Sequence, residues 1–234
     1  MTELLKVCMA LDNTVSRRTV VIDAGYVPLE GELALPAEPR GIIAFAHGSG
    51  SSRFSPRNAW VANYLNGAGL ATLLFDLLSA EEELRDRQTS EHRFDIGLLA
   101  SRLAVAVGWL EADGDAAGLP IGLFGASTGA GAALITAADH PGAVGAVVSR
   151  GGRPDLADDA LRRVQAPTLL IVGELDVVVQ TLNEDAMMRM AAEVDLAIVP
   201  GASHLFEETG SLDQAAALAR EWFLGHLTDP APHR

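Results

Sequence analysis

Short apolar runs alternate with helix-length segments along most of this chain of 234 residues. The run at 41–46 (GIIAFA) is apolar throughout, which is typical of a strand covered on both faces. Strands are expected at 18–24, 27–35, 41–46, 70–75, 121–124, 144–149, 168–172 and 195–199. Helices are expected at 56–67, 89–111, 128–139, 182–193 and 211–227. Repeated strand–helix–strand units predict an α/β fold, with a mostly parallel central sheet and helices on both faces.

We expect one domain at 18–228, with an N-terminal extension at 1–17 and a C-terminal tail at 229–234. The formal net charge of -14 argues against nucleic acid as a partner, because phosphate binding depends on Lys and Arg. The single cysteine, Cys8, excludes an intramolecular disulfide. No apolar run approaches the roughly 20 residues that span a bilayer, and the first residues do not resemble a signal peptide. We therefore expect a cytoplasmic protein with no membrane partner; the sequence does not indicate its oligomeric state.

The most informative segment is GASTG, which lies between a predicted strand and a predicted helix. It matches the G-x-S-x-G nucleophile elbow, in which a serine occupies a sharp, strained turn. Ser127 is the expected nucleophile, and Gly125 and Gly129 leave room for the turn. The helix that follows directs its N-terminus at this serine, so its dipole and the amide of Thr128 are suited to stabilise an oxyanion.

Two other interpretations of these glycines exist. Read with Gly131, they match the G-x-x-x-G-x-G pattern by which short-chain dehydrogenases bind a dinucleotide. The motif lies halfway along the chain, however, and neither Tyr26 nor Tyr64 is followed four residues later by the lysine such enzymes use. The glycines also suit simple close packing of a helix against a strand.

An acid and a histidine follow in the order that an α/β-hydrolase triad requires. Asp176 comes just after the apolar strand TLLIV, and His204 comes just after the next strand. The carboxyl ends of parallel strands share one edge of a sheet, so both side chains are expected near Ser127. Histidine accepts the serine proton near neutral pH, and the carboxylate orients the imidazole. Glu174 and Asp185 are the alternative acids.

The segment HGSGSSR follows the strand at 41–46, where an α/β-hydrolase supplies its second oxyanion-hole amide. We expect the N–H groups of Ser49 and Thr128 to bind the oxyanion, with His47 and Gly48 beside the substrate. The alternative is a flexible Gly/Ser loop in which His47 acts as a cap.

Arg150 and Arg153 lie near the end of a predicted strand and are candidates to bind an anionic group of the substrate. The alternative is ordinary ion pairing with nearby aspartates. Only 17 residues separate Arg150 from the next predicted strand, so we expect little or no lid and an open site. Trp60 and Trp109 fall on amphipathic segments and are expected in the core. No metal-ligand cluster is recognisable, and no metal site is expected.

HGSGSSR, GASTGAG, GELD and GASHLF occur in this order, each after a predicted strand. With these segments the chain resembles the dienelactone-hydrolase-like branch of the α/β-hydrolases, from about residue 18 to about residue 227. The resemblance implies hydrolysis of a small ester or lactone through an acyl-enzyme, without a cofactor. Dienelactone hydrolases proper use a cysteine nucleophile, whereas this elbow carries Ser127, which favours a carboxylesterase-like activity. Some similar domains are joined to phosphoribosyltransferases, and no segment of this sequence resembles that second domain.

Two further functions are compatible with these residues. The same triad serves acyl transfer or perhydrolysis when an alcohol or a peroxide replaces water. A receptor that binds a small molecule without turning it over also fits, because receptors on this fold retain the triad.

Overall fold

The structure is a computed structural model that describes residues 15–25 and 27–227. An eight-stranded sheet runs through its centre in the order β1-β2-β4-β3-β5-β6-β7-β8. The strands are β1 (Ser16–Asp23), β2 (Pro28–Leu35), β3 (Ile42–Ala46), β4 (Ala71–Phe75), β5 (Ile121–Ala126), β6 (Val144–Arg150), β7 (Thr168–Gly173) and β8 (Val194–Val199). β2 pairs antiparallel with β1 and β4, and the pairs from β4 to β8 are parallel.

All eight predicted strands are present, and the prediction of a mostly parallel sheet is confirmed. β1 begins at Ser16, inside the segment expected to be an N-terminal extension. Residues 1–14 of that extension, with Cys8, and the C-terminal tail lie outside the described residues, as does Tyr26.

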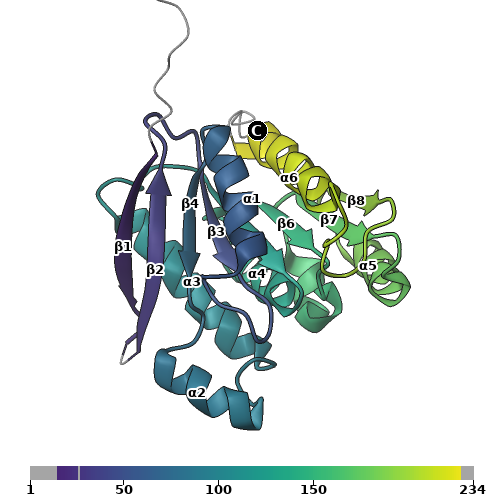
Figure 1. Cartoon of the computed structure of the whole chain (residues 1–234), viewed down its shortest axis with the longest axis horizontal. Coiled ribbons are helices and arrows are strands. Elements are labelled where there is room, and N and C mark those ends of the chain that lie inside the picture. Colours follow the sequence, from purple (N-terminus) through teal and green to yellow (C-terminus); the bar gives the residue numbers. More distant parts are fainter. Residues whose placement is uncertain (1–14, 26, 228–234) are drawn as a thin grey trace, which may run out of the picture.

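Helices cover both faces of the sheet, as Figure 1 shows. On one face, α1 (Pro56–Gly67) and α6 (Ser211–Leu227) pack against each other and against a core that includes Phe124 and Phe223. On the other face lie α3 (Ile96–Ala112), α4 (Thr128–Asp139) and the 3-10 helix η1 (Pro154–Arg163), with α5 (Val177–Arg189) beside η1. No helix of the described chain is long and apolar enough to cross a membrane.

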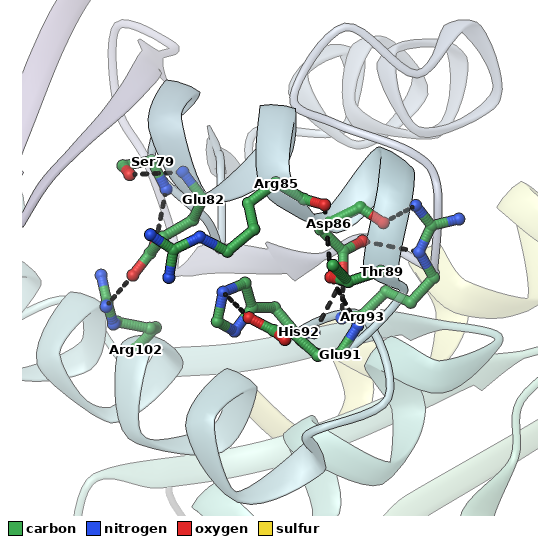
Figure 2. Close-up of polar contacts among 9 residues, drawn as sticks. All are labelled: Ser79, Glu82, Arg85, Asp86, Thr89, Glu91, His92, Arg93 and Arg102. Carbon is green, nitrogen blue, oxygen red and sulfur yellow. Dashed lines mark hydrogen bonds and ion pairs between the residues drawn. The ribbon is translucent and has the colours of Figure 1, made fainter.

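The helix predicted at 89–111 is wrong at its start, because two helices share this region. α2 (Ala80–Thr89) is followed by its C-cap Ser90, whose φ is +58°. α3 begins at Ile96, with Asp95 as its N-cap. Figure 2 shows the cause. The buried carboxylate of Asp86 accepts hydrogen bonds from the backbone N–H groups of His92 (2.7 Å) and Arg93 (3.0 Å), and from Nε of Arg93 (2.6 Å). These contacts reverse the chain between the two helices.

α2 stands out beyond the carboxyl ends of β3 and β4, on the side of the sheet where functional loops gather (Figure 1). Ser79 caps it through a reciprocal capping box with Glu82. Glu82 also accepts a hydrogen bond from Arg102 of α3 at 2.9 Å, which fixes α2 to the body of the protein.

Two smaller predictions are corrected. The helix expected at 182–193 runs instead over Val177–Arg189, because Asp176 already stands at its N-cap position and the backbone of Met190 is extended. Trp60 is 52% exposed rather than in the core, and its indole N–H donates to Asp213 of α6 at 3.0 Å. Trp109 is partly buried against the core.

Candidate active site

Ser127 occupies the turn between β5 and α4, with a φ of +51° and a ψ of -121°. A side-chain-bearing residue rarely adopts this backbone conformation, so the turn is strained. A Cβ on Gly125 would collide with the backbone of Ala130, and one on Gly129 with the carbonyl of Ala46. Both glycines are therefore required by close approach at the turn, as the sequence motif indicated.

His204 and Asp176 meet in the loops that follow β8 and β7. Nδ1 of His204 lies 2.6 Å from Oδ2 of Asp176, and the Asp176 side chain is largely buried. The two alternative acids have other positions: Glu174 is exposed and accepts from the backbone N–H of Gly201 at 2.7 Å, and Asp185 is exposed on α5. Of the three candidate acids, Asp176 is the one whose carboxylate contacts the ring of His204.

A cavity of about 180 Å³ opens at the carboxyl ends of the strands, and both Ser127 and His204 line it. Its walls come from the loop after β3, the first turn of α1, the elbow, the end of β6 and the loop after β8. The residues lining it are Gly48, Ser49, Ser51, Ser55, Arg57, Asn58, Ala126, Ser127, Arg150, Gly151, His204 and Leu205. η1 fills the short connection after β6, where an α/β-hydrolase lid is commonly inserted.

The predicted oxyanion donors, Ser49 and Thr128, are in direct contact. Thr128 is the first residue of α4, where a backbone N–H has no acceptor within the helix. The backbone N–H of Ser49, which the sequence predicts as an oxyanion donor, donates here to the side-chain Oγ1 of Thr128 at 2.9 Å. The side chain of Thr128 is thus part of the arrangement, which the sequence motif did not reveal.

His47 does not line the cavity, and its predicted place beside the substrate is wrong. It is buried, with Nδ1 3.1 Å from the carbonyl oxygen of Gly48 and Nε2 accepting the backbone N–H of Leu77 at 3.1 Å. Burial lowers the pKa of this ring, outweighing the hydrogen bond to Gly48. The capping interpretation is the one that fits. Gly48 does line the cavity, and a Cβ there would lie 3.1 Å from Cβ of Ser127.

The two arginines predicted to bind substrate differ sharply. Arg153 pairs with Asp155 through two hydrogen bonds of 2.7 and 2.8 Å and is absent from the cavity wall, so the alternative of a loop ion pair is correct for it. Arg150 lines the cavity and is only 6% exposed. It pairs with Ala126 in the β5–β6 register, and its carbonyl accepts the N–H of Ser127 at 3.3 Å.

Arg150 has few partners among the described residues. Its Nε has none, no described carboxylate forms an ion pair with it, and one terminal nitrogen lies 3.5 Å from Oδ1 of Asn58. Its guanidinium also lies over the ring of Phe206, 5.5 Å from the centroid. Burial, and then the charge of Arg57, lower the pKa of Arg150 to about 10. This cation is therefore held in the cavity wall without a compensating carboxylate from residues 15–25 or 27–227.

Arg57 and Asn58 belong to the site although the sequence did not single them out. Both lie in the first turn of α1, which Ser55 caps by accepting the backbone N–H of Asn58 at 3.3 Å. Arg57 pairs with Glu207 at 3.2 Å. Pro56 at the first helical position was the available signal, since it predicts a helix N-terminus just after the glycine-rich loop. No group of three or more His, Cys, Asp or Glu side chains in the described chain is arranged to hold a metal ion.

Comparison with known proteins identifies the family. The model of the Dienelactone hydrolase family matches residues 29–225. This chain belongs to the dienelactone hydrolase family. The crystal structure of a dienelactone hydrolase from Anabaena variabilis is 56% identical, covers 91% of this chain and 99% of its own, and superposes with a TM-score of 0.90. The fold class and the family resemblance predicted from the sequence are confirmed.

The chain is also similar to a protein of much lower sequence identity and to two proteins that are about twice its length. Est1E from Butyrivibrio proteoclasticus shares the fold of this dienelactone hydrolase family member, with a TM-score of 0.76 at 15% identity over 90% of this chain and 99% of its own. Proteins from two strains of Mycobacterium tuberculosis, each named "Putative phosphoribosyl transferase", are 57% identical over 223 residues. That match covers 95% of this chain and 49% of theirs, so the chain spans about half the length of these relatives.

Proposed function

We propose that this chain is a serine hydrolase that cleaves small carboxylic esters or lactones through an acyl-Ser127 intermediate. The observation that carries the proposal is the 2.6 Å contact between His204 and Asp176 at the edge of the cavity that contains Ser127. A strained serine, a histidine and a buried carboxylate in this order are the parts that nucleophilic acyl transfer needs. Membership of a hydrolase family supports the same conclusion.

In the proposed mechanism, Nε2 of His204 takes the proton of Ser127 as Oγ attacks the substrate carbonyl carbon. The carbonyl π electrons move to oxygen, and Asp176 stabilises the imidazolium that forms. When the tetrahedral species collapses, the bond to the alkoxide breaks and His204 gives that alkoxide the proton. Water then attacks the acyl-enzyme by the same steps and releases the carboxylic acid. The N-terminus of α4, with the backbone N–H of Thr128, stabilises the oxyanion.

We further propose that the substrate carries a carboxylate or another small anionic group, which Arg150 binds. A buried guanidinium without a carboxylate is costly, and an anion in the cavity would offset that cost. The N-terminus of α1 adds partial positive charge from the same wall, which also carries Arg57, the partner of Glu207 in an ion pair. This local concentration of positive charge occurs in a chain whose net charge is -14. Arg153 has no part in it.

Substrate pairs with one anionic and one neutral member of similar size test this part of the proposal. One pair is monomethyl and dimethyl succinate, with the anion on the acyl side; the other is 4-acetoxybenzoate and 4-acetoxybenzamide, with the anion on the alcohol side. We expect kcat/KM to favour the anionic member of at least one pair by roughly 10- to 100-fold, as for a hydrogen bond to a charged group. Arg150→Gln should abolish the preference, and Arg153→Gln, the matched control, should keep it. Equal rates within both pairs for the wild type would contradict the proposal.

The acyl-enzyme itself is tested with 4-nitrophenyl acetate. A pre-steady-state burst of 4-nitrophenol, absent in Ser127→Ala, is the expected result. Added methanol or hydrogen peroxide then separates hydrolysis from acyl transfer and perhydrolysis, because a competing nucleophile changes the product ratio. A folded protein that gives no burst and no turnover, yet is stabilised by small anionic esters, would instead support a receptor.

We do not propose phosphoribosyl transfer for this chain, although the Mycobacterium tuberculosis relatives are named for it. The region that they share with this chain includes the segment that the dienelactone hydrolase family model matches, and it covers 49% of their length.

A further inference from the structure

The hydroxyl of Thr128 has an unused hydrogen-bond donor beside Ser49, which lines the cavity. Thr128 directly follows Ser127, and its side chain is 3% exposed. Its Oγ1 accepts the backbone N–H of Ser49 at 2.9 Å. A hydroxyl has one proton to donate and two lone pairs to accept with. Within the described part of the chain, no hydrogen bond has Oγ1 of Thr128 as its donor, so that proton remains available.

The amide of Ser49 cannot serve an oxyanion while it donates to Thr128. The loop after β3 supplies the second oxyanion donor in this fold, and here that N–H is directed at a side-chain oxygen. Two solutions exist: the hydroxyl moves away and releases the amide, or the hydroxyl itself becomes the donor. The second leaves the bond between Ser49 and Thr128 in place. It also strengthens the donor, because a hydroxyl that accepts one hydrogen bond is polarised and donates the next more strongly.

We infer that the side-chain hydroxyl of Thr128 donates a hydrogen bond to the oxyanion, with the N–H of Ser49 acting through it. This inference rests on the proposed function of the same site. Thr128 then contributes two donors, its backbone N–H at the start of α4 and its Oγ1–H. No proton is transferred in this step: the hydroxyl keeps its hydrogen, and the negative charge stays on the substrate oxygen.

Two substitutions separate the hydroxyl from the volume of the side chain. Thr128→Val is nearly isosteric and removes the donor, whereas Thr128→Ser keeps it. We expect Thr128→Val to lower kcat by roughly 10- to 100-fold with little change in KM, at or below the range for loss of an oxyanion-hole donor. Thr128→Ser should stay within about threefold of the wild type, since it keeps that donor. A kcat for Thr128→Val equal to or above that of the wild type would overturn the inference, an increase meaning that the hydroxyl blocks the Ser49 amide.

A spectroscopic measurement distinguishes this role from a structural one. A trifluoromethyl ketone adds to Ser127 and forms a hemiketal whose oxyanion titrates, and ¹⁹F NMR reports its pKa. Loss of a donor raises that pKa, because the charged form loses stabilisation. Thr128→Val should therefore raise it, and Thr128→Ser should leave it near the wild-type value. An unchanged hemiketal pKa in Thr128→Val, with an unchanged melting temperature, would overturn the inference.

Failure of the inference is distinguishable from failure of the proposed function. If Ser127→Ala hydrolyses esters as fast as the wild type, or the ketone forms no adduct with the folded wild type, the proposed function is wrong and the inference falls with it. If turnover depends on Ser127 but not on the hydroxyl of Thr128, only the inference is wrong.

Discussion

Gly151 lies against the backbone of His204, and its φ of +51° is in the region that favours glycine. A Cβ at this position would stand 3.1 Å from the carbonyl oxygen of His204 and 3.6 Å from Nδ1 of its ring. Gly151 follows Arg150 at the end of β6, and its N–H donates to Ile171 of β7 at 2.8 Å. The end of β6 therefore fixes the position of the loop that carries His204.

Replacing Gly151 by alanine should impair both stability and turnover. The positive φ costs about 1–2 kcal/mol in unfolding free energy for a residue with a Cβ. The added methyl group also displaces His204, and we expect kcat to fall by about tenfold, since small errors in catalytic geometry are costly. Urea unfolding and ester hydrolysis measure the two effects.

Gly118→Ala is the matched control for this substitution. Gly118 has a φ of +85°, but nothing lies within 4 Å of the position of its Cβ. It should lose similar stability and keep the parent kcat. If Gly151→Ala also keeps the parent kcat, the contact with His204 has no effect on the site.

Asp176→Asn should leave the fold intact and lower kcat by roughly 10³- to 10⁴-fold. An amide at 2.6 Å from Nδ1 of His204 neither stabilises the imidazolium nor holds the required tautomer. Steady-state hydrolysis of 4-nitrophenyl acetate measures the loss. Asp185→Asn is the control, because Asp185 is an exposed carboxylate on α5, the helix whose N-cap is Asp176. Equal losses in the two variants, or a small loss in Asp176→Asn, would exclude Asp176 as the orienting acid.

His47 should make the protein less stable as the pH falls below about 6.5, the ordinary pKa of histidine. Burial lowers the pKa of this ring in the folded state, so the unfolded state binds the proton first as the pH decreases. Protonation at Nε2 would also remove the acceptor of the Leu77 N–H. The stability is therefore complete above pH 6.5 and is lost between that pH and the lower folded-state pKa.

Unfolding free energies measured between pH 8 and pH 5 test this dependence. His47→Gln should be less stable at pH 8 by about 1–3 kcal/mol, because a buried hydrogen-bond network is rebuilt imperfectly. Its stability should change less with pH than that of the wild type. His140→Gln, at an exposed histidine, should keep the wild-type slope. A slope in His47→Gln as steep as in the wild type would show that another group is responsible.

Much of the fold was predictable because it depends on local patterns. Apolar runs located β3 to β8, the turn at Gly25 separated β1 from β2, and Pro56 marked the start of α1 at the correct residue. The helix predicted at 89–111 failed because its break depends on Asp86 meeting the backbone of His92 and Arg93, a contact that no periodicity records. The prediction that Trp60 lies in the core was wrong, because α1 directs this side chain toward Asp213, at the outer edge of the packing with α6.

The candidate site, too, could be predicted only in part. The candidate triad of Ser127, Asp176 and His204 could be proposed from the sequence, because each residue follows a strand and the order of residue types is restrictive. The roles of the arginines were not recognisable, since Arg150 and Arg153 are three residues apart and differ only in what surrounds them. Gly151 and the hydroxyl of Thr128 contact loops that are distant in the sequence, and the sequence does not show those contacts.

The most direct test of the account is the covalent labelling of the folded protein with a fluorophosphonate, followed by peptide mass mapping. We predict one adduct, located on Ser127, formed in the wild type and absent in Ser127→Ala. An adduct on another residue, or none on the folded wild type, would contradict the claim that Ser127 is the activated nucleophile of this site.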